Sequence, residues 1–378
     1  VHPFGAGVAK PADVNGDGKL ELLLLQTPGQ FKARQLYEGH LQRLGLDEAD
    51  LELHCLTAWT LDGEKLWQHG RPWDRRDPFT GHGGGDLVRV DDVNADGKAE
   101  VLCLRDRELL MLDGATGKEL KSTTLPADNY VRLYTAQLSD PAEGRQILCR
   151  VNDRAYKPWQ YANPTIILNA DLSVRHEPFA VRGAGHNLVA TDLDGDGRDE
   201  LLIGYSLFDH DLRELWRLDL GEDFDYAGDH ADEIALDTLP DSGRPCIRYA
   251  GSEDFFVVDL KGNVLWRTEA GHSQKSVSGP WGPDGEQRIL MSEKNRGVWG
   301  LDAGGTVLWN RKDINGYAGP AVRWQRQGPR EAWCLFRPQL PPFHPTPYLS
   351  DPADSETLWP KFIDGDGTLL EALPWDPA

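Results

Sequence analysis

The segment DLDGDGRDELLIGY, residues 192–205, places alternating acids and glycines directly before an apolar run. Hard cations such as Ca²⁺ take several oxygen ligands, which acids at this spacing around a glycine turn supply. Position twelve, where an EF-hand loop carries its glutamate, is Ile203, and an acid stands at position nine instead, as Glu200. The segment therefore predicts a cation-binding turn that leads into a β-strand, and it does not fit a helix–loop–helix hand.

The same turn occurs twice more, as DVNGDGKLE from Asp13 and DVNADGKAE from Asp92. Copies of one loop indicate internal repeats. We expect structural Ca²⁺ in these turns and no organic cofactor. The predicted ligands are Asp13, Asn15, Asp17 and Glu21; Asp92, Asn94, Asp96 and Glu100; and Asp192, Asp194, Asp196 and Glu200.

A second repeat is the phrase D-x-x-G-x-x-L-W, as in DLKGNVLWRT (259–268) and LDAGGTVLWN (301–310), with LDGEKLWQ (61–68) as a copy in which Thr60 holds the first position. With four looser copies, each is two apolar runs around a tight polar turn, which is typical of a β-hairpin. Each repeating unit has four strands. An acidic turn joins the first strand to the second, a connection leads to the third, and this hairpin joins the third strand to the fourth.

Seven such units predict an all-β chain, a seven-bladed β-propeller of four-stranded antiparallel blades. We expect one domain over 1–378. The expected blades lie near 1–70, 80–125, 128–180, 183–222, 226–269, 270–314 and 315–378.

Composition agrees with this architecture. The 40 glycines and 25 prolines suit a turn-rich β chain, and several of the 13 tryptophans end the fourth strands, where they would pack between blades. The five cysteines lie one per blade in apolar runs, so buried thiols are expected in preference to disulfides. They are Cys55, Cys103, Cys149, Cys246 and Cys334.

The formal net charge of −21 argues against nucleic acid as a partner, because nucleic acid requires a basic surface. No apolar run approaches the length that spans a membrane. Ca²⁺ turns and a first residue that is Val1, not methionine, lead us to expect a periplasmic or secreted protein whose leader has been removed. We also expect a monomer.

Three long insertions, 27–50, 152–163 and 337–356, each separate the second and third strands of a blade. In such a blade these connections lie on the face opposite the acidic turns. Loops on a rigid scaffold tend to carry function. The acidic turns are therefore interpreted as structural, and the insertion face as the functional one.

Histidines mark that face at the starts of four blades: His82, His186, His230 and His272. They would converge beside the axis, together with Arg182, Arg154 and Tyr226. A functional pocket is the leading hypothesis. The alternative is that each histidine packs on neighbouring glycines, and a metal held by some of them is a further alternative, since neutral imidazole is a common ligand.

The run RGAGHNLVATDLDGDGRDELLIGYSLFDHDLRELW (182–216), followed by GDHAD (228–232) and AGHSQKSVSG (270–279), resembles the propeller enzymes that cleave rhamnose–uronate linkages. These are the ulvan lyases, the L-rhamnose–glucuronate lyases and related rhamnosidases, with rhamnogalacturonan lyases more distant. The resemblance implies an acidic oligosaccharide or polysaccharide as partner. It also implies cleavage by β-elimination.

The resemblance further implies roles for individual residues. His82 and Arg182 would engage the uronate carboxylate, and Tyr156 or Tyr161 would move protons. The implied substrate-binding residues are Arg154, His186, Tyr226, His230 and His272. His186 also resembles a histidine that helps hold a structural zinc in ulvan lyases, although the cysteine and histidine expected shortly after it are absent here.

These residue types suit elimination, because charge that develops on the uronate must be stabilised while a group of suitable pKa takes the C5 proton. Three rivals stay open. One is a rhamnose-releasing hydrolase in which a histidine, Asp232 or Glu233 activates water. The second is a non-catalytic glycan-binding or adhesion propeller, and the third is a quinone-binding propeller, suggested by the tryptophan hairpins.

Overall fold

A computed structural model describes the parts of the chain that surround the predicted turns and hairpins. The described residues are 8–26, 55–70, 87–105, 107–127, 130–152, 161–221, 230–239, 243–280, 282, 285–293, 297–313, 317–318, 324–325, 331–332, 334–337 and 361–372. They form two compact units. One comprises 1–181, 190–201 and 208–213, and the other comprises 182–189, 202–207 and 214–378.

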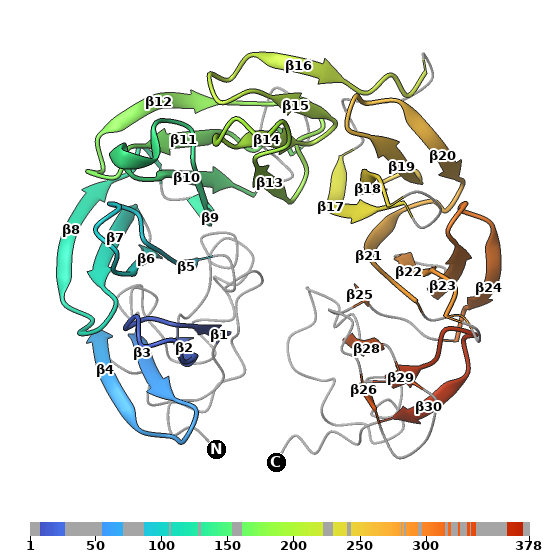
Figure 1. The fold of residues 1–378 in the computed structure, drawn as a ribbon, viewed down its shortest axis with the longest axis horizontal. Helices are drawn as coiled ribbons and strands as arrows, with labels where there is room; N and C mark the ends of the chain where they lie inside the picture. The colour runs from blue at the N-terminus through green and yellow to red at the C-terminus, as the bar shows by residue number, and fades with distance from the viewer. Residues whose placement is uncertain are drawn as a thin grey trace, which may run out of the picture. The chain divides into compact units, whose positions relative to one another are not determined.

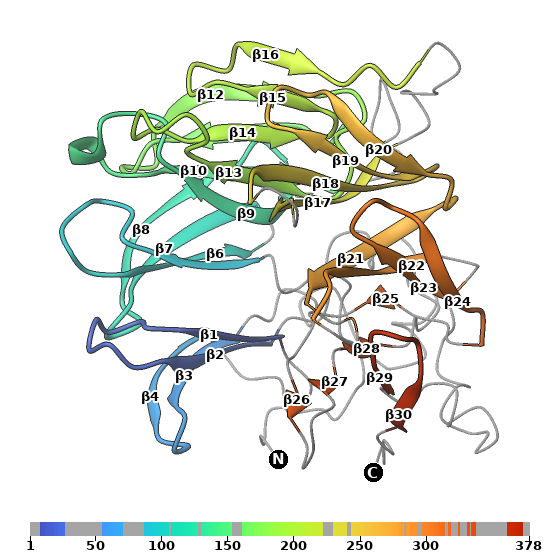
Figure 2. The same cartoon turned by 45° about the vertical axis from the view of Figure 1, so that its right-hand side comes forward.

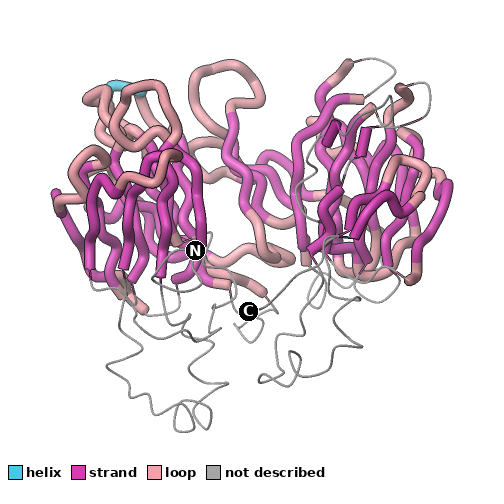
Figure 3. The backbone as a smooth tube through the Cα atoms, turned by 90° about the horizontal axis from the view of Figure 1, so that it is seen from below, coloured by secondary structure: helices cyan, strands magenta, loops and turns pink. Residues whose placement is uncertain are grey.

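Three four-stranded antiparallel sheets belong wholly to the first unit (Figure 1). The first holds β1 (Val8–Ala12), β2 (Glu21–Gln26), β3 (Cys55–Thr60) and β4 (Lys65–Gly70). The second holds β5 (Val88–Asp91), β6 (Glu100–Arg105), β7 (Glu108–Asp113) and β8 (Glu119–Thr124). The third holds β9 (Tyr130–Ala136), β10 (Gln146–Val151), β11 (Thr165–Leu168) and β12 (Val174–Phe179). A single 3₁₀ turn, η2 (Pro141–Glu143), is the helical segment of the described chain, cyan in Figure 3.

A fourth sheet has residues in both units. It holds β13 (Leu188–Thr191), β14 (Glu200–Ile203), β15 (Ser206–Phe208) and β16 (Glu214–Arg217). Two further complete sheets lie in the second unit. They are β17 (Ala231–Thr238), β18 (Pro245–Gly251), β19 (Phe255–Asp259) and β20 (Val264–Thr268), then β21 (Ser273–Gly279), β22 (Arg288–Glu293), β23 (Gly297–Asp302) and β24 (Val307–Arg311).

The last sheet also has four strands, β25 (Tyr317–Ala318), β28 (Cys334–Arg337), β29 (Lys361–Ile363) and β30 (Leu369–Ala372). A small ribbon pairs β26 (Trp324–Gln325) with β27 (Glu331–Ala332). Seven four-stranded antiparallel sheets, six of them built from directly successive strands, confirm the predicted all-β fold class. Most residues of the expected insertions lie outside the described residues, but the strands flanking them are the second and third of their sheets, as predicted.

Burial within a sheet falls from its middle strands to its fourth strand. All six residues of β10 are buried, and β6 and β7 are nearly as buried, whereas five of the six residues of β8 are exposed. The middle strands are continuous apolar runs because both of their faces are covered. The fourth strands carry charged residues, which discourage pairing with another chain at an open edge.

The Asp-Gly hairpins form for a local reason. Asp259 accepts hydrogen bonds through Oδ1 from the backbone N–H groups of Lys261 and Asn263, both at 2.9 Å. Asp302 does the same for the hairpin that joins β23 to β24. Gly262 then adopts φ +83°, a left-handed conformation that favours glycine. The repeated aspartate and glycine of the phrase are therefore turn-forming residues.

Tryptophans of the fourth strands dock on the hairpin of the following sheet. Trp216 donates from Nε1 to Leu260 O at 3.0 Å, and Trp309 donates to Gly365 O at 2.8 Å. A Cβ added to Gly262 would lie 2.9 Å from the ring of Trp216, so the hairpin glycine also makes room for the indole. The predicted packing of tryptophans between sheets is confirmed at these positions.

The predicted burial is confirmed for the four cysteines whose side chains the structure describes, none of which forms a disulfide: Cys55, Cys103, Cys149 and Cys246. Burial raises the pKa of Cys103 to about 12, so its thiol stays protonated and unreactive. Among the described residues, no helix has the length and apolarity needed to cross a membrane.

Candidate functional site

A glycine-rich segment fixes His186 against the start of β17. The backbone N–H of His186 donates to Ala231 O at 3.0 Å, and the N–H of Ala231 donates to Gly183 O at 3.2 Å. Gly185, at φ +61°, approaches so closely that an added Cβ would lie 1.8 Å from Ala231 O. The sequence GAGH is therefore required for this close approach, and it sets the place of the imidazole that follows.

Three imidazoles converge on one carboxylate in the second unit. The Nε2 atom of His186 lies 3.4 Å from Oδ1 of Asp232. The Nε2 atoms of His230 and His272 lie 3.6 Å and 3.1 Å from Oδ2 of the same residue. His186 and His272 each pack edge-to-face on the ring of His230. The predicted convergence of these three histidines is therefore observed, with an acid at its centre.

The four side chains differ in their access to solvent. His186 and His272 are 25% and 27% exposed, whereas Asp232 is 4% exposed and His230 is 6% exposed. A large ligand can therefore touch the imidazoles of His186 and His272, whereas His230 and Asp232 are buried beneath them.

The buried Oδ2 atom of Asp232 accepts no hydrogen bond of normal geometry from any described residue. Leaving a buried acceptor unsatisfied costs roughly 1–3 kcal/mol, and more for a charged group. The imidazoles of His230 and His272 are close enough to donate after a small rotation. A bound cation would satisfy the same oxygen.

The donors fit a transition metal. Ligand atoms of His186, His230 and Asp232 all lie within 4.8 Å of one another. Two imidazoles and one carboxylate form a three-ligand set that is typical of catalytic zinc sites. The Nε2 atoms of His186 and His230 lie 3.4 Å and 3.6 Å from different oxygens of Asp232.

Two polar side chains hold the cluster from behind. Ser252 places its Oγ 2.7 Å from Nδ1 of His230. The buried Glu293 accepts a hydrogen bond through Oε1 from the backbone N–H of His272 at 3.2 Å. The Oγ of Ser252 also lies 3.4 Å from Nε2 of His230, so Ser252 contacts the ring itself, whereas Glu293 holds the backbone of His272.

Glu233 is committed to a different network. Its Oε2 accepts from the backbone N–H of Ser276 at 2.6 Å and from the hydroxyl of the same residue at 2.9 Å. Its Oε1 lies 3.4 Å from Nζ of Lys275. These contacts join β17 to β21, so Glu233 serves packing between sheets and is poorly placed to activate water.

Other predicted site residues lie elsewhere. His82, Arg154, Tyr156 and Tyr226 are outside the described residues. Tyr161 is described, is partly buried and adopts φ +48°, but it belongs to the first unit. Arg182 lies in the second unit, directly before the Gly183 that bonds to β17.

Hydrogen bonds within each acidic turn close the turn on itself. In the second turn, Asp92 accepts through Oδ2 from Gly97 N at 3.0 Å, and Glu100 accepts through Oε2 from Val93 N at 2.9 Å. Asn94 also donates from Nδ2 to Oε1 of Glu100 at 2.9 Å. Corresponding bonds form in the first turn, including one from Asn15 to Glu21.

The third turn differs because Asp194 replaces the asparagine. Asp192, Asp194 and Glu200 bring carboxylate oxygens within 4.8 Å of one another. Burial, followed by the charges of nearby aspartates, raises the pKa of Glu200, although a hydrogen bond from Leu193 N opposes the rise. His210 adds an imidazole nitrogen 3.8 Å from Asp196. The donors fit a divalent cation, which stays a prediction for all three turns.

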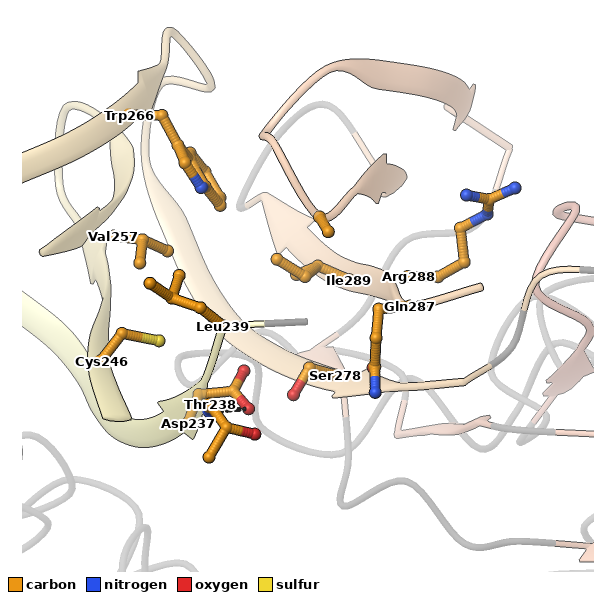
Figure 4. A pocket seen from close by; sticks show the side chains of 11 residues that line it. Asp237, Thr238, Leu239, Cys246, Val257, Trp266, Ser278, Gln287, Arg288 and Ile289 are labelled. Atoms are coloured by element: carbon orange, nitrogen blue, oxygen red, sulfur yellow. Dashed lines mark hydrogen bonds between the residues drawn. The ribbon is translucent and has the colours of Figure 1, made fainter. Parts of the chain in front are cut away.

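A separate hollow lies between the sheets β17–β20 and β21–β24, which are neighbours in Figure 2. Its wall is apolar, with Trp266, Val257 and Leu239 on one side, and Asp237 and Ser278 stand at its polar edge (Figure 4). None of the predicted catalytic or binding residues lines it. The candidate functional site is therefore the cluster of His186, His230, His272 and Asp232, and not this hollow.

Sequence reasoning missed the central role of Asp232 and did not find Ser252. The sequence HAD (230–232) did indicate the position of Asp232. Alternate residues of a strand lie on one face, so Asp232 is expected beside His230. Ser252 is 22 positions from His230 in the chain and gave no sequence signal.

Comparisons with known proteins indicate a class of relatives. No family model matches the chain. The rhamnogalacturonan endolyase YesW of Bacillus subtilis (strain 168) is 26% identical over 340 residues, covering 71% of this chain and 48% of the relative. The rhamnogalacturonan exolyase YesX of the same organism is 23% identical over 355 residues, covering 80% of this chain and 54% of the relative. The chain thus spans about half the length of these relatives.

Solved structures support the fold. A crystal structure of the exotype rhamnogalacturonan lyase YesX aligns with TM-score 0.60 at 18% identity, covering 85% of this chain and 59% of the other. The Vibrio cholerae biofilm matrix protein Bap1 aligns with TM-score 0.59 at 12% identity, covering 98% of this chain and 81% of the other. An enzyme and a matrix protein therefore share this architecture, so the fold alone does not distinguish catalysis from adhesion.

Proposed function

We propose that this chain is the cleaving part of a polysaccharide lyase that acts on an acidic glycan by β-elimination at a rhamnose–uronate linkage. The observation that carries the proposal is the convergence of His186, His230 and His272 on the buried Asp232. The similarity to rhamnogalacturonan lyases supports the same reaction class.

Rhamnogalacturonan is the favoured substrate class. Both curated relatives carry that substrate in their names, so galacturonate is preferred over the glucuronate of ulvan-type glycans as the uronic acid. Both sugars present a carboxylate beside C5, and the same cluster could engage either one. Ulvan and other glucuronate-containing glycans are therefore tested as substrates beside rhamnogalacturonan.

The reaction removes a weakly acidic proton. A base takes the proton from C5 of the uronate, the C5–H electrons form the C4–C5 double bond, and the C4–O4 bond breaks as O4 receives a proton. As the proton leaves C5, negative charge develops on the uronate carboxylate. Preorganised hydrogen-bond donors and cations that stabilise this charge in the transition state contribute most to the rate. Arg182 and the exposed imidazoles of His186 and His272 are assigned to hold that carboxylate.

Proton transfer falls to groups beside the sugar. Tyr156 or Tyr161 from the insertion after β10 remains the proposed base, and His82 the proposed second contact to the carboxylate. Arg154 and Tyr226 complete the proposed sugar contacts. General acid–base help of this kind contributes typically about 10²–10⁴-fold.

A divalent metal held by His186, His230 and Asp232 would supply a Lewis acid for the uronate carboxylate. With or without it, the buried Asp232 keeps the three imidazoles oriented toward one point. The acidic turns are proposed to bind Ca²⁺ as structural braces. A polymeric substrate and Ca²⁺-dependent turns suit a periplasmic or secreted enzyme.

The hydrolase alternative is weaker, because Glu233 is held by Ser276 and Asp232 is surrounded by imidazoles. The adhesion alternative retains the same fold without turnover. A quinone-binding alternative would require a bound chromophore.

The test is ultraviolet absorbance of the purified protein with rhamnogalacturonan, ulvan and gum arabic in parallel, with product analysis. A growing unsaturated-uronate band that disappears in Arg182→Ala and His272→Gln protein is the expected result. Free rhamnose without that band would reassign the protein to hydrolysis. Binding without any product would overturn the enzyme assignment.

A further inference from the structure

We infer that Gln274 is a substrate-contacting residue whose carboxamide binds a sugar hydroxyl of the glycan beside His272. The inference rests on the glycan-cleaving role proposed for the histidine cluster, and it adds one contact to that site. It follows from the place of Gln274 in a β-bulge that recurs in neighbouring sheets.

Gln274 and Asp232 occupy the same place in successive sheets. The register of β17 with β18 shifts at Asp232, which is left as the extra residue of a β-bulge. The register of β21 with β22 shifts at Gln274 in the same way. Each residue follows a histidine of the cluster by two positions, as HAD (230–232) and HSQ (272–274). Because a bulge re-aims the side chain of its extra residue, equivalent bulges present Gln274 and Asp232 on equivalent sides of their sheets.

The bulge itself does not require a polar residue. In the sheet of β9, the register with β10 shifts between Tyr130 and Arg132, which leaves Val131 as the extra residue. Val131 is buried and apolar. The amide of Gln274 is therefore not explained by the backbone geometry that the residue adopts.

The carboxamide of Gln274 has no protein partner among the described residues, although the residue is only 7% exposed. Neither amide atom is among the completely buried atoms without a partner, so both keep access to solvent. Gln146 behaves differently, since it accepts from Leu138 N at 2.7 Å and donates to Ser139 Oγ at 2.8 Å. A mostly buried amide without partners costs free energy, which a ligand that hydrogen-bonds to it would recover.

The backbone on both sides of Gln274 is tied to the preceding sheet. The Oγ of the buried Ser273 lies 3.0 Å from Asp254 O. The backbone N–H of Ser276 donates to Oε2 of Glu233 at 2.6 Å. The amide is therefore held in place before a ligand arrives, which reduces the conformational entropy lost on binding.

The ligand chemistry follows from the amide and its surroundings. A carboxamide both donates and accepts hydrogen bonds, as a sugar hydroxyl does. The neighbouring His272 is 27% exposed and is already assigned to the uronate carboxylate. Two buried carboxyl groups, of Asp232 and Glu293, lie at the same ends of these sheets, which disfavours a second anion at Gln274. A neutral hydroxyl of the same glycan is therefore the favoured partner.

The test is steady-state kinetics of the whole chain on rhamnogalacturonan. Gln274→Leu should raise KM by roughly 3- to 10-fold, the effect of losing one neutral hydrogen bond, and should leave kcat near that of the wild type. Gln274→Glu, which keeps acceptor oxygens, should show a loss of similar size. A loss beyond about 100-fold in the glutamate variant would indicate contact with a carboxylate and would overturn the hydroxyl assignment. Gln68→Leu, on the exposed face of β4, is the matched control and should keep wild-type kinetics.

Thermal unfolding distinguishes the contact from a structural role. Gln274→Leu should unfold at or above the wild-type temperature, because it removes no hydrogen bond within the protein. Gln146→Leu should unfold at a lower temperature, because it removes the bonds to Leu138 and Ser139. If Gln274→Leu lowers the unfolding temperature and leaves KM unchanged, Gln274 is structural and the inference is overturned.

Failure of this contact and failure of the lyase assignment give different results. If wild-type protein forms unsaturated product and Gln274→Leu keeps the wild-type KM, the contact falls while the lyase assignment stands. If wild-type protein forms no such product, the lyase assignment falls, and calorimetric titration with rhamnogalacturonan oligosaccharides decides the contact. Weaker binding by Gln274→Leu than by wild-type protein would then support it, whereas equal binding, or none by either protein, would overturn it.

Discussion

The Nε2 atom of His272 lies 3.1 Å from Oδ2 of Asp232, closer than either of the other imidazole nitrogens lies to this carboxylate. The contact joins the start of β21 to the start of β17, so the acid links two sheets as well as three histidines. Its buried charge is therefore the feature on which the orientation of the whole cluster depends.

For the proposed elimination reaction on rhamnogalacturonan, Asp232→Asn should lower kcat by roughly 10²–10³-fold, the loss seen when one preorganised electrostatic group is removed. The amide has nearly the same shape but no charge to orient the imidazoles. Steady-state rates of the unsaturated product measure the effect. Asp219→Asn, on an exposed turn, is the control. Equal activity of both variants would remove Asp232 from the site.

Gly185→Ala should displace His186 and reduce activity, while Gly197→Ala should leave activity near that of the wild type. Both glycines have positive φ, at +61° and +88°, so each alanine carries backbone strain of about 1–2 kcal/mol. Only at Gly185 would the new Cβ collide with a neighbour, Ala231 O at 1.8 Å, whereas nothing lies within 4 Å at Gly197. Activity assays paired with thermal unfolding separate the collision from the shared strain.

Local features of the fold were predictable because their causes are local. In four hairpins the aspartate bonds to the backbone groups two and four residues later, at Asp209, Asp259, Asp302 and Asp364. The acidic turns likewise bond within themselves. Both patterns are visible in a short stretch of sequence. Seven four-stranded sheets followed from counting them.

The site was only partly predictable. Repeat spacing brought His186, His230 and His272 together, since each precedes the first strand of its sheet. The acid at their centre and the hydroxyl of Ser252 depend on side chains that meet across strands and turns. Such pairings depend on register and rotamer, which one sequence without its structure does not specify.

Trp266→Phe should destabilise the protein less than Trp216→Phe. Trp216 donates from Nε1 to Leu260 O, so its loss leaves a carbonyl without its partner, at a cost of roughly 1–3 kcal/mol. The buried Nε1 of Trp266 has no acceptor among the described residues, although its ring packs on Gly305 in the same manner. Urea unfolding of the two variants measures the difference. Equal losses would show that ring packing alone determines the cost.

Without divalent cations, Glu200→Gln should raise the melting temperature at neutral pH by roughly 2–4 °C, the shift expected for about 1 kcal/mol. Burial and the neighbouring aspartates raise the pKa of Glu200 in the folded state. A carboxyl with a raised folded pKa stabilises the fold below its unfolded pKa, and this stabilisation is lost as pH rises through the folded pKa. The gain from glutamine should therefore shrink in mild acid, where wild-type Glu200 is protonated.

Asp194→Asn should make the third turn resemble the second and reduce its dependence on Ca²⁺. Asn94 donates to Glu100 at 2.9 Å, whereas Asp194 has no N–H to donate and adds charge beside Glu200. We expect the variant to lose less melting temperature on chelation than the wild type, and the converse change, Asn94→Asp, to lose more. Differential scanning calorimetry with and without chelator measures both. Asp194→Asn removes one carboxylate from its turn and Asn94→Asp adds one, so their effects on cation binding should have opposite signs. If chelation lowers the melting temperature of both variants and of the wild type equally, the acidic turns do not bind the cation that stabilises this fold.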